Sequence, residues 1–347
     1  MIDSILVFVA KHASSLPERL VRGLFLLAAD VLWLLGLGGE RQLERNLVHV
    51  LHARDGAIPS RREVRHTARL AMRSYFTYFS EAMTLEARDT LTLDARVRGT
   101  GAYLADIQAD ARRGSVPAAL GHQGNWDYAG FWSHLHLLPV TTVAERLSNE
   151  QLLEEFISIR KRAGISIFTT KTPGLTDRLK HVMTGEEHRL VPLLADRDLS
   201  HHGEFVEAFD SMIRVARGPA TLSYDLMTPL YVVNVYRERL HGERRRAAKT
   251  PYGYVIDISG KIDPHTYEGM NREDALRAIS QEWVRQWSAG VMAHPQDWHM
   301  LQPVFLEDMD ASRMSNVPAD VARRIASLHA HDHNRGQSAD GEGVKSR

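Results

Sequence analysis

The sequence predicts an α/β fold in which a central, mostly parallel sheet carries helices on both faces and follows a helical N-terminal region. Apolar side chains recur at helical spacing in the first hundred residues. From about residue 97, short apolar runs alternate with helical stretches. Such alternation is typical of a sheet with helices packed on its faces. We expect a helical region over residues 1–95, an α/β core over 96–310 and a polar, disordered tail over 311–347.

The pattern places individual elements within these regions. Residues 61–83 form a helix whose apolar side chains lie on one side and most of whose arginines lie on the other. In the core, strands are expected at residues 116–121, 140–147, 165–168, 188–196, 229–237 and 253–258. Helices are expected at residues 149–164, 176–185 and 273–295.

The composition argues against several functions. The 43 basic and 43 acidic residues cancel, so no overall positive field indicates nucleic-acid binding, and we expect no nucleic-acid partner. The absence of cysteine removes disulfides, thiolate zinc sites and a cysteine nucleophile. We also expect no metal site, since a histidine-rich stretch at residues 329–333 lies in the polar tail and is interpreted as adventitious.

An apolar segment at residues 23–38 favours contact with a membrane surface. Sixteen helical residues span roughly 24 Å, whereas a bilayer core is about 30 Å thick. Asp30 lies in the middle of the segment, where a charge inside a bilayer would be costly. We therefore predict a helix that lies in the membrane interface, with Arg19 and Arg22 near headgroups and Trp33 at the boundary. A buried core helix is the alternative.

Two polar clusters follow apolar runs and are the candidate site. They are His122, Asn125 and Asp127 after the first run, and Asp196, Arg197 and Asp198 after the second. Binding sites in open α/β sheets gather where strands end. Asn125 is a natural N-cap for a following helix, so His122 would lie in the turn before it.

His122 can act as a general base if a carboxylate orients its ring. On one continuous helix, residues five apart point about 140° from each other. Asp127 therefore serves His122 only if a turn separates the two. Two alternatives stay open from the residues alone: His122 is a structural histidine, and Asp127 is a first-turn acid that interacts with the helix dipole.

Several stretches resemble a known family. The stretch HQGNWD (residues 122–127) resembles the H-x4-D/E motif of glycerolipid-type acyltransferases, and more narrowly that of the bacterial lauroyl/myristoyl lipid A acyltransferase superfamily. Further stretches resemble the actinobacterial phosphatidylinositol mannoside acyltransferases: TTVAERL (141–147), ADRDLS (195–200), ARGPATL (216–222) and DWHMLQP (297–303). The similarity runs in order from about residue 20 to 305, and it implies a glycerolipid-acyltransferase-like fold.

The resemblance also implies roles for single residues. His122, Asp127 and Asp196 would be catalytic. Glu145, Arg146, Arg160, Gly218 and Pro219 would bind substrate. The mycobacterial branch has glutamate where this chain has Asp196, which is one methylene shorter. Either the backbone lies closer, or a water bridges the gap, or Asp127 orients the histidine instead.

Other implied roles leave alternatives open. Glu145 and Arg160 could pair across the site, or an arginine could bind a substrate phosphate; a surface ion pair is the alternative. Gly218 and Pro219 would shape a loop before a helix whose N-terminus faces an anion. Trp298 is expected to pack beneath the wall of the site, with His299 behind it.

The activity implied is transfer of a palmitoyl-type chain from acyl-CoA to a mannose hydroxyl of phosphatidylinositol mannosides. Acyl-CoA would be a substrate, and no cofactor would be required. The enzyme would work at the cytoplasmic face of the plasma membrane as a peripheral or monotopic protein. The alternatives are a lipid A-like or other glycolipid acceptor, hydrolysis of acyl-CoA, and non-catalytic lipid binding.

Overall fold

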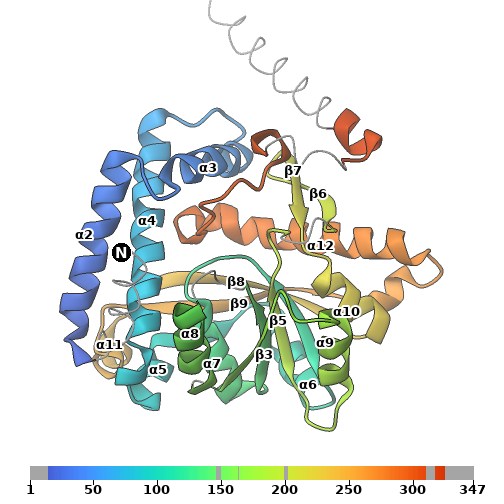
Figure 1. The fold of residues 1–347 in the computed structure, drawn as a ribbon, viewed down its shortest axis with the longest axis horizontal. Coiled ribbons are helices and arrows are strands. Elements are labelled where there is room, and N and C mark those ends of the chain that lie inside the picture. The colour runs from blue at the N-terminus through green and yellow to red at the C-terminus, as the bar shows by residue number, and fades with distance from the viewer. Residues whose placement is uncertain (1–14, 146–149, 163, 199–201, 310–316, 325–347) are drawn as a thin grey trace, which may run out of the picture.

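The computed structural model describes residues 15–145, 150–162, 164–198, 202–309 and 317–324 (Figure 1). These residues include a seven-stranded sheet. Its strands lie in the order β1 (Val97–Thr100), β9 (Tyr252–Ile262), β8 (Leu230–Arg239), β2 (Val116–Leu120), β5 (Leu190–Leu194), β3 (Val140–Ala144) and β4 (Ile165–Thr169). Only β8 and β9 pair antiparallel among these neighbours. The predicted mostly parallel sheet is therefore confirmed.

Helices cover both faces of the sheet, as predicted (Figure 1). They are α6 (Leu104–Ala111) and α7 (Trp126–His136) on one face, and α10 (Gly218–Leu226) and α12 (Arg272–Ala293) on the other. Alternating residues of β2 explain this: Ala118 and Leu120 belong to the core on the α7 side, and Ala119 to the core on the α12 side. All three are buried, as in other central parallel strands.

The strand directions determine where a site can form. Because β2, β5, β3, β4 and β8 run parallel to one another, their carboxyl ends meet at one edge of the sheet. The remaining helices connect and flank these strands. They are α8 (Glu150–Arg162) after β3, α9 (Leu175–Thr184) after β4, α11 (Gly242–Ala248) between β8 and β9, and η3 (Pro264–Tyr267), η4 (Pro295–Asp297) and η5 (Leu306–Asp308) around α12.

The N-terminal region is helical, as predicted. It contains α2 (Glu18–Leu35), α3 (Glu40–Asp55), α4 (Arg61–Met83), η2 (Leu85–Ala87) and α5 (Thr90–Arg96). Ser60 begins α4 by accepting a hydrogen bond from the Glu63 amide. Figure 1 shows α2 alongside α4, and their contact is one of the most extensive in the molecule. The inner face of α4 also packs on η4, which follows α12.

Helix α2 buries one side and exposes the other. Asp30, the charge within the apolar segment, pairs with Arg69 (3.0 Å) and Arg73 on α4. Trp33 also faces α4 and donates a hydrogen bond to the Arg65 carbonyl. The outward face carries exposed apolar side chains at Leu20, Leu24, Leu27, Val31, Leu34 and Leu35. Among the described helices, none alone has the length and hydropathy to cross a bilayer, and α2 with α3, bent by 81°, has them only as a pair.

One hairpin lies outside the predicted elements. Strands β6 (Glu204–Ala208) and β7 (Ser211–Val215) pair antiparallel and pack against α12 (Figure 1). Beyond it, part of the predicted tail has structure: Val321 is buried against Met212 and Leu306. The expectation of disorder is therefore wrong for residues 317–324, while the histidine-rich stretch at 329–333 lies outside the described residues. The domain boundaries stay a prediction.

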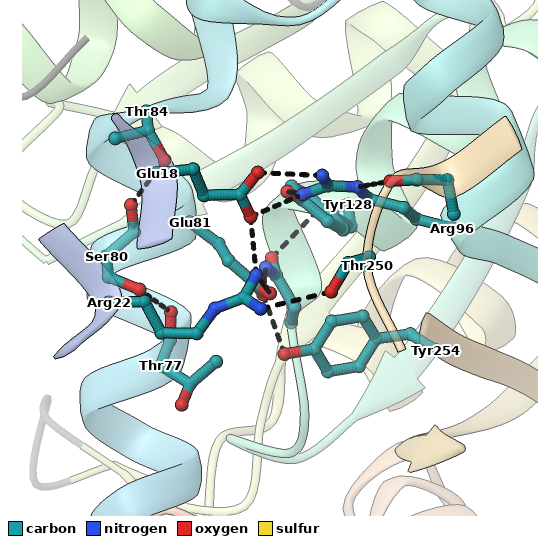
Figure 2. A network of polar contacts seen from close by, with 12 residues as sticks. Glu18, Arg22, Thr77, Ser80, Glu81, Thr84, Arg96, Tyr128, Thr250 and Tyr254 are labelled. Atoms are coloured by element: carbon teal, nitrogen blue, oxygen red, sulfur yellow. Dashed lines mark hydrogen bonds and ion pairs between the residues drawn. The ribbon is translucent and has the colours of Figure 1, made fainter. Parts of the chain in front are cut away.

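A network of polar side chains joins α2 to the core, as Figure 2 shows. Glu18 on α2 accepts hydrogen bonds from Arg96 (Nη2 to Oε2, 2.9 Å) and pairs with Arg88 (3.0 Å) and Arg22. The side chains of Arg88 and Arg96 are almost completely buried. Burial alone would raise the pKa of Glu18, but the bond from Arg96 and the charges of the three arginines lower it to about 2.

This shift predicts an acid-sensitive contribution to stability. The pKa of Glu18 falls from 4.5 to about 2 on folding, so its stabilisation is complete above pH 4.5 and is lost as the pH falls toward 2. The contribution at neutral pH is about 3 kcal/mol. We expect Glu18→Gln to lower the free energy of unfolding in urea by this order at pH 7, and by progressively less between pH 4.5 and 2.

An exposed ion pair provides the control for this measurement. Glu187 pairs with Arg189 but is 65% exposed, so Glu187→Gln should change the unfolding free energy by less than about 1 kcal/mol at any pH. A Glu18→Gln deficit that did not shrink on acidification would contradict the role given to the carboxylate charge.

Candidate active site

The turn after β2 holds the first cluster in place. Gly124 has φ +56°, and a Cβ there would lie 2.7 Å from the Val235 carbonyl oxygen, so the turn requires glycine. Asn125 then caps α7, with its Oδ1 accepting a hydrogen bond from the Tyr128 amide (2.9 Å). The predicted N-cap is confirmed. His122 therefore lies in the turn, at the carboxyl end of β2.

Asp196, at the carboxyl end of the neighbouring strand β5, binds His122 directly. His122 Nδ1 lies 2.6 Å from Asp196 Oδ1, and the His122 amide donates to Oδ2 (2.9 Å). Trp298 Nε1 also donates to Oδ2 (2.9 Å). Asp196 is completely buried, whereas the His122 side chain is 29% exposed. The shorter acid thus reaches the ring without a bridging water.

The surroundings of Asp196 keep it ionised. Burial alone would raise the pKa of Asp196, but the charge of His122 and hydrogen bonds from His122 and Trp298 lower it below its ordinary value. An ionised carboxylate accepts the Nδ1 proton, so whenever the ring is neutral its Nε2 is unprotonated. Within the described residues, Nε2 makes no hydrogen bond, so it can accept a proton from a ligand.

Asp127 has different partners. It lies in the first turn of α7, as predicted, but it pairs with Arg160 (Nε to Oδ1, 2.6 Å) and accepts a hydrogen bond from Tyr78 (3.1 Å). Burial, and next the charge of Asp127, raise the pKa of Tyr78 well above its ordinary value, so its hydroxyl stays a donor. The structure therefore gives the orienting contact on His122 to Asp196, and Asp127 anchors Arg160.

Glu145 and Arg160, which could have paired with each other, have different partners. Glu145 follows β3 and pairs with Arg197 (2.9 Å), so of the alternatives left open for Glu145 the structure does not show the pair with Arg160. The reason is that Asp127 and Tyr78 already hold the Arg160 guanidinium. Arg146 lies outside the described residues.

The stretch after η4 contributes more than the expected packing. Trp298 is completely buried and forms a hydrogen bond with Asp196, as described above. Behind it, His299 Nε2 lies 3.0 Å from Ser74 Oγ, and that hydroxyl donates to Asp297 (2.9 Å). Burial, then the charges of His122 and Arg237, lower the pKa of His299 to about 3. His299 is therefore neutral, and its amide donates to the His122 carbonyl (2.7 Å).

His122 borders a cavity of about 1120 Å³, which is large for a ligand pocket. Leu120, Val233 and Ile258 lie side by side on three adjacent strands and form part of its floor. Helix α7 contributes Ala129, Gly130 and Ser133 to the wall. The interior between sheet and α7 is therefore mainly apolar, and it is open to His122.

Charged residues border the same cavity at the carboxyl edge of the sheet. Lys171, which is exposed, follows β4, and Arg197 follows β5. Gly218 and Pro219 also line the cavity, but they are the first residues of α10 itself and not a loop before it. Arg217, just before them, pairs with Glu204 (2.7 Å). Within the described ranges, no group of three histidine, aspartate or glutamate side chains is arranged to hold a metal ion.

Residues 1–307 match the model of the bacterial lipid A biosynthesis acyltransferase family. The chain belongs to this family. This acyltransferase is 29% identical over 310 residues to a phosphatidylinositol mannoside acyltransferase of Mycolicibacterium smegmatis, covering 87% of this chain and 91% of the relative. It is 30% identical over 312 residues to a phosphatidylinositol mannoside acyltransferase of Mycobacterium tuberculosis, covering 87% and 88% respectively.

An acyltransferase must remove a proton from its acceptor while the acyl group is held nearby. In this acyltransferase, His122 lines the apolar cavity, and its Nε2 makes no hydrogen bond to the described residues. Asp196 Oδ1 lies 2.6 Å from His122 Nδ1 and holds the ring in place.

Proposed function

We propose that this acyltransferase moves a palmitoyl-type chain from acyl-CoA to a mannose hydroxyl of a phosphatidylinositol mannoside. The observation that carries the proposal is the His122–Asp196 pair at the mouth of an apolar cavity. The names of the relatives from Mycolicibacterium smegmatis and Mycobacterium tuberculosis support the acceptor.

The proposed reaction is direct transfer, with no cofactor and no acyl-enzyme. His122 Nε2 takes the proton of the acceptor hydroxyl as its oxygen attacks the thioester carbonyl. The new C–O bond forms, the C–S bond breaks, and the departing thiolate takes the proton from the imidazolium. Asp196 stays ionised throughout and stabilises the positive ring, as a triad carboxylate does.

The apolar part of the cavity would hold the acyl chain. We expect Val233→Phe to shift the preference toward shorter acyl donors, because its ring would fill the floor between Leu120 and Ile258. The measurement is kcat/KM across acyl-CoA donors of increasing chain length. Val233→Leu adds less volume and should shift the preference less. An unchanged chain-length profile in Val233→Phe would show that the acyl chain binds elsewhere.

The charged border of the cavity would bind substrate phosphates, since both proposed substrates carry them. Lys171 is an exposed positive charge at this border, and Arg197 is a second basic residue there, paired with Glu145. The enzyme would sit at the cytoplasmic face of the plasma membrane as a peripheral protein. Support for membrane contact comes from the exposed apolar face of α2, which begins beside the exposed Arg19.

A product assay tests the proposal. Palmitoyl-CoA is supplied with phosphatidylinositol mono- and dimannosides, with a lipid A precursor, or with no acceptor, and acylated lipids are identified by mass spectrometry. We expect an acylated mannoside as the main product. Acylation of only the lipid A precursor would show that the acceptor is a lipid A-like glycolipid and not a phosphatidylinositol mannoside. Thiol release that is unchanged by any acceptor, without an acylated lipid, would indicate a hydrolase.

A further inference from the structure

We propose that Glu81, on α4, is a positioning residue for acyl transfer and acts by fixing the amide of Asn125. The inference rests on the proposed function of His122. Glu81 is buried, and it lies 41 positions before His122, outside the five motif stretches quoted above. Figure 2 shows its carboxylate between Arg22 of α2 and Tyr254 of β9.

The contacts of Glu81 determine how Asn125 is oriented. Glu81 Oε2 accepts hydrogen bonds from Asn125 Nδ2 (3.0 Å) and from the Tyr254 hydroxyl (2.7 Å). Arg22 Nη2 lies 3.4 Å from Oε1. A carboxylate only accepts hydrogen bonds, so Asn125 must turn its NH2 group toward Glu81. Its carbonyl oxygen then faces the Tyr128 amide, which is the orientation that caps α7.

The cap in turn holds the side chains around His122. Trp126 is the first residue of α7. Its ring meets the His122 ring edge-on, with the ring centroids 5.7 Å apart, and lies against the Tyr78 ring, with centroids 3.9 Å apart. A flipped Asn125 amide would present NH2 to the Tyr128 amide, and the cap would be lost. Trp126 and the His122 ring would then move, and a displacement of about 1 Å at a reacting group lowers the rate by about 10²-fold.

Glu81→Gln tests this step with a side chain of the same shape. If glutamine turns its oxygen toward Asn125, its NH2 faces Arg22, and if it turns its NH2 toward Asn125, two donors meet. The first arrangement would keep the capping orientation of Asn125, but the charge of Arg22 favours the second, in which the glutamine oxygen faces Arg22. The second arrangement disfavours the capping orientation of Asn125. We expect kcat to fall by about 10- to 100-fold, while KM for both substrates and the melting temperature stay close to those of wild type.

A second substitution should restore the site. Asn125→Asp alone places two buried carboxylates at hydrogen-bond distance, and it should also lower kcat. In the double variant Glu81→Gln/Asn125→Asp, the glutamine NH2 donates to one aspartate oxygen, the other oxygen caps Tyr128, and the glutamine oxygen accepts from Arg22. We expect its kcat to recover to within about threefold of wild type.

Glu18→Gln is the matched control, because it removes a carboxylate from the same network without touching Asn125. Its kcat should equal that of wild type at a temperature where both are folded. A proton NMR spectrum adds a readout that needs no substrate. The proton between His122 and Asp196 should resonate at low field in wild type and Glu18→Gln, shift in Glu81→Gln, and return in the double variant.

Three results would overturn the proposal. The first is a wild-type kcat and a wild-type resonance in Glu81→Gln. The second is a double variant whose kcat is no higher than that of the slower single variant. The third is a set of kcat reductions that simply follow the reductions in melting temperature. If the wild-type protein acylates no glycolipid, the proposed function fails. The NMR series then still decides whether Glu81 positions the His122 ring.

Discussion

Replacing His122 with glutamine is expected to lower the rate of acyl transfer by about 10²- to 10⁴-fold, because the reaction loses its general base. Glutamine cannot accept a hydroxyl proton near neutral pH, but its side chain can still form a hydrogen bond with Asp196. The measurement is kcat for acylated glycolipid, determined by mass spectrometry with palmitoyl-CoA and the preferred acceptor.

The fold of the His122→Gln protein must be checked in parallel. His122 is partly exposed at the cavity mouth, so its replacement should change the melting temperature little. A folded His122→Gln protein that keeps wild-type kcat would rule out the proposed base. It would favour a lipid-binding protein or another catalytic group.

Asp196→Asn is expected to lower kcat by about 10³- to 10⁴-fold, through the tautomer of His122. The His122 amide and Trp298 Nε1 both donate to Asp196 Oδ2, so asparagine would place its oxygen there. Its NH2 group would then face Nδ1 and require that nitrogen to accept. The ring proton would move to Nε2, and the imidazole could no longer remove a proton from the acceptor.

Nitrogen NMR of labelled histidine distinguishes this account from a loss of packing. The His122 ring should carry its proton on Nδ1 in wild type and on Nε2 in Asp196→Asn. KM for the acyl donor should stay near its wild-type value, because Asp196 is buried behind His122 and is not among the residues that line the cavity. Full activity with the proton still on Nδ1 would contradict the role of Asp196.

Much of the fold was predictable because its signals are local. The apolar runs at residues 116–121 and 188–196 are strands β2 and β5, trimmed by one or two residues at their ends. The β6–β7 hairpin gave no such signal. Its turn uses Phe209 and Asp210 at φ 54° and 55°, where hairpins of this kind usually have asparagine and glycine. Contact with α12, not local pattern, holds those two strands.

The site was predictable in its residues but not in its pairings. The motif stretches identified His122, Asp127 and Asp196, and strand ends predicted that they would lie close together. Which acid meets the histidine depends on the neighbouring positions of β2 and β5, and sequence spacing favours Asp127. Trp298 binds Asp196 from 102 positions away, and no local pattern indicates such a contact.

Helix α2 has one buried face and one exposed apolar face, and this affects how the protein can be modified for expression and purification. Its leucine-rich outer face invites truncation as a route to better solubility. Removing the helix would also remove Glu18, the anion that pairs with Arg88 and Arg96, and with it a contribution of about 3 kcal/mol at neutral pH. Polar replacements at Leu24, Leu27 and Leu34 keep the Glu18 carboxylate and reduce the exposed apolar surface that favours aggregation. Redesign of this surface is therefore a better route than deletion of the helix.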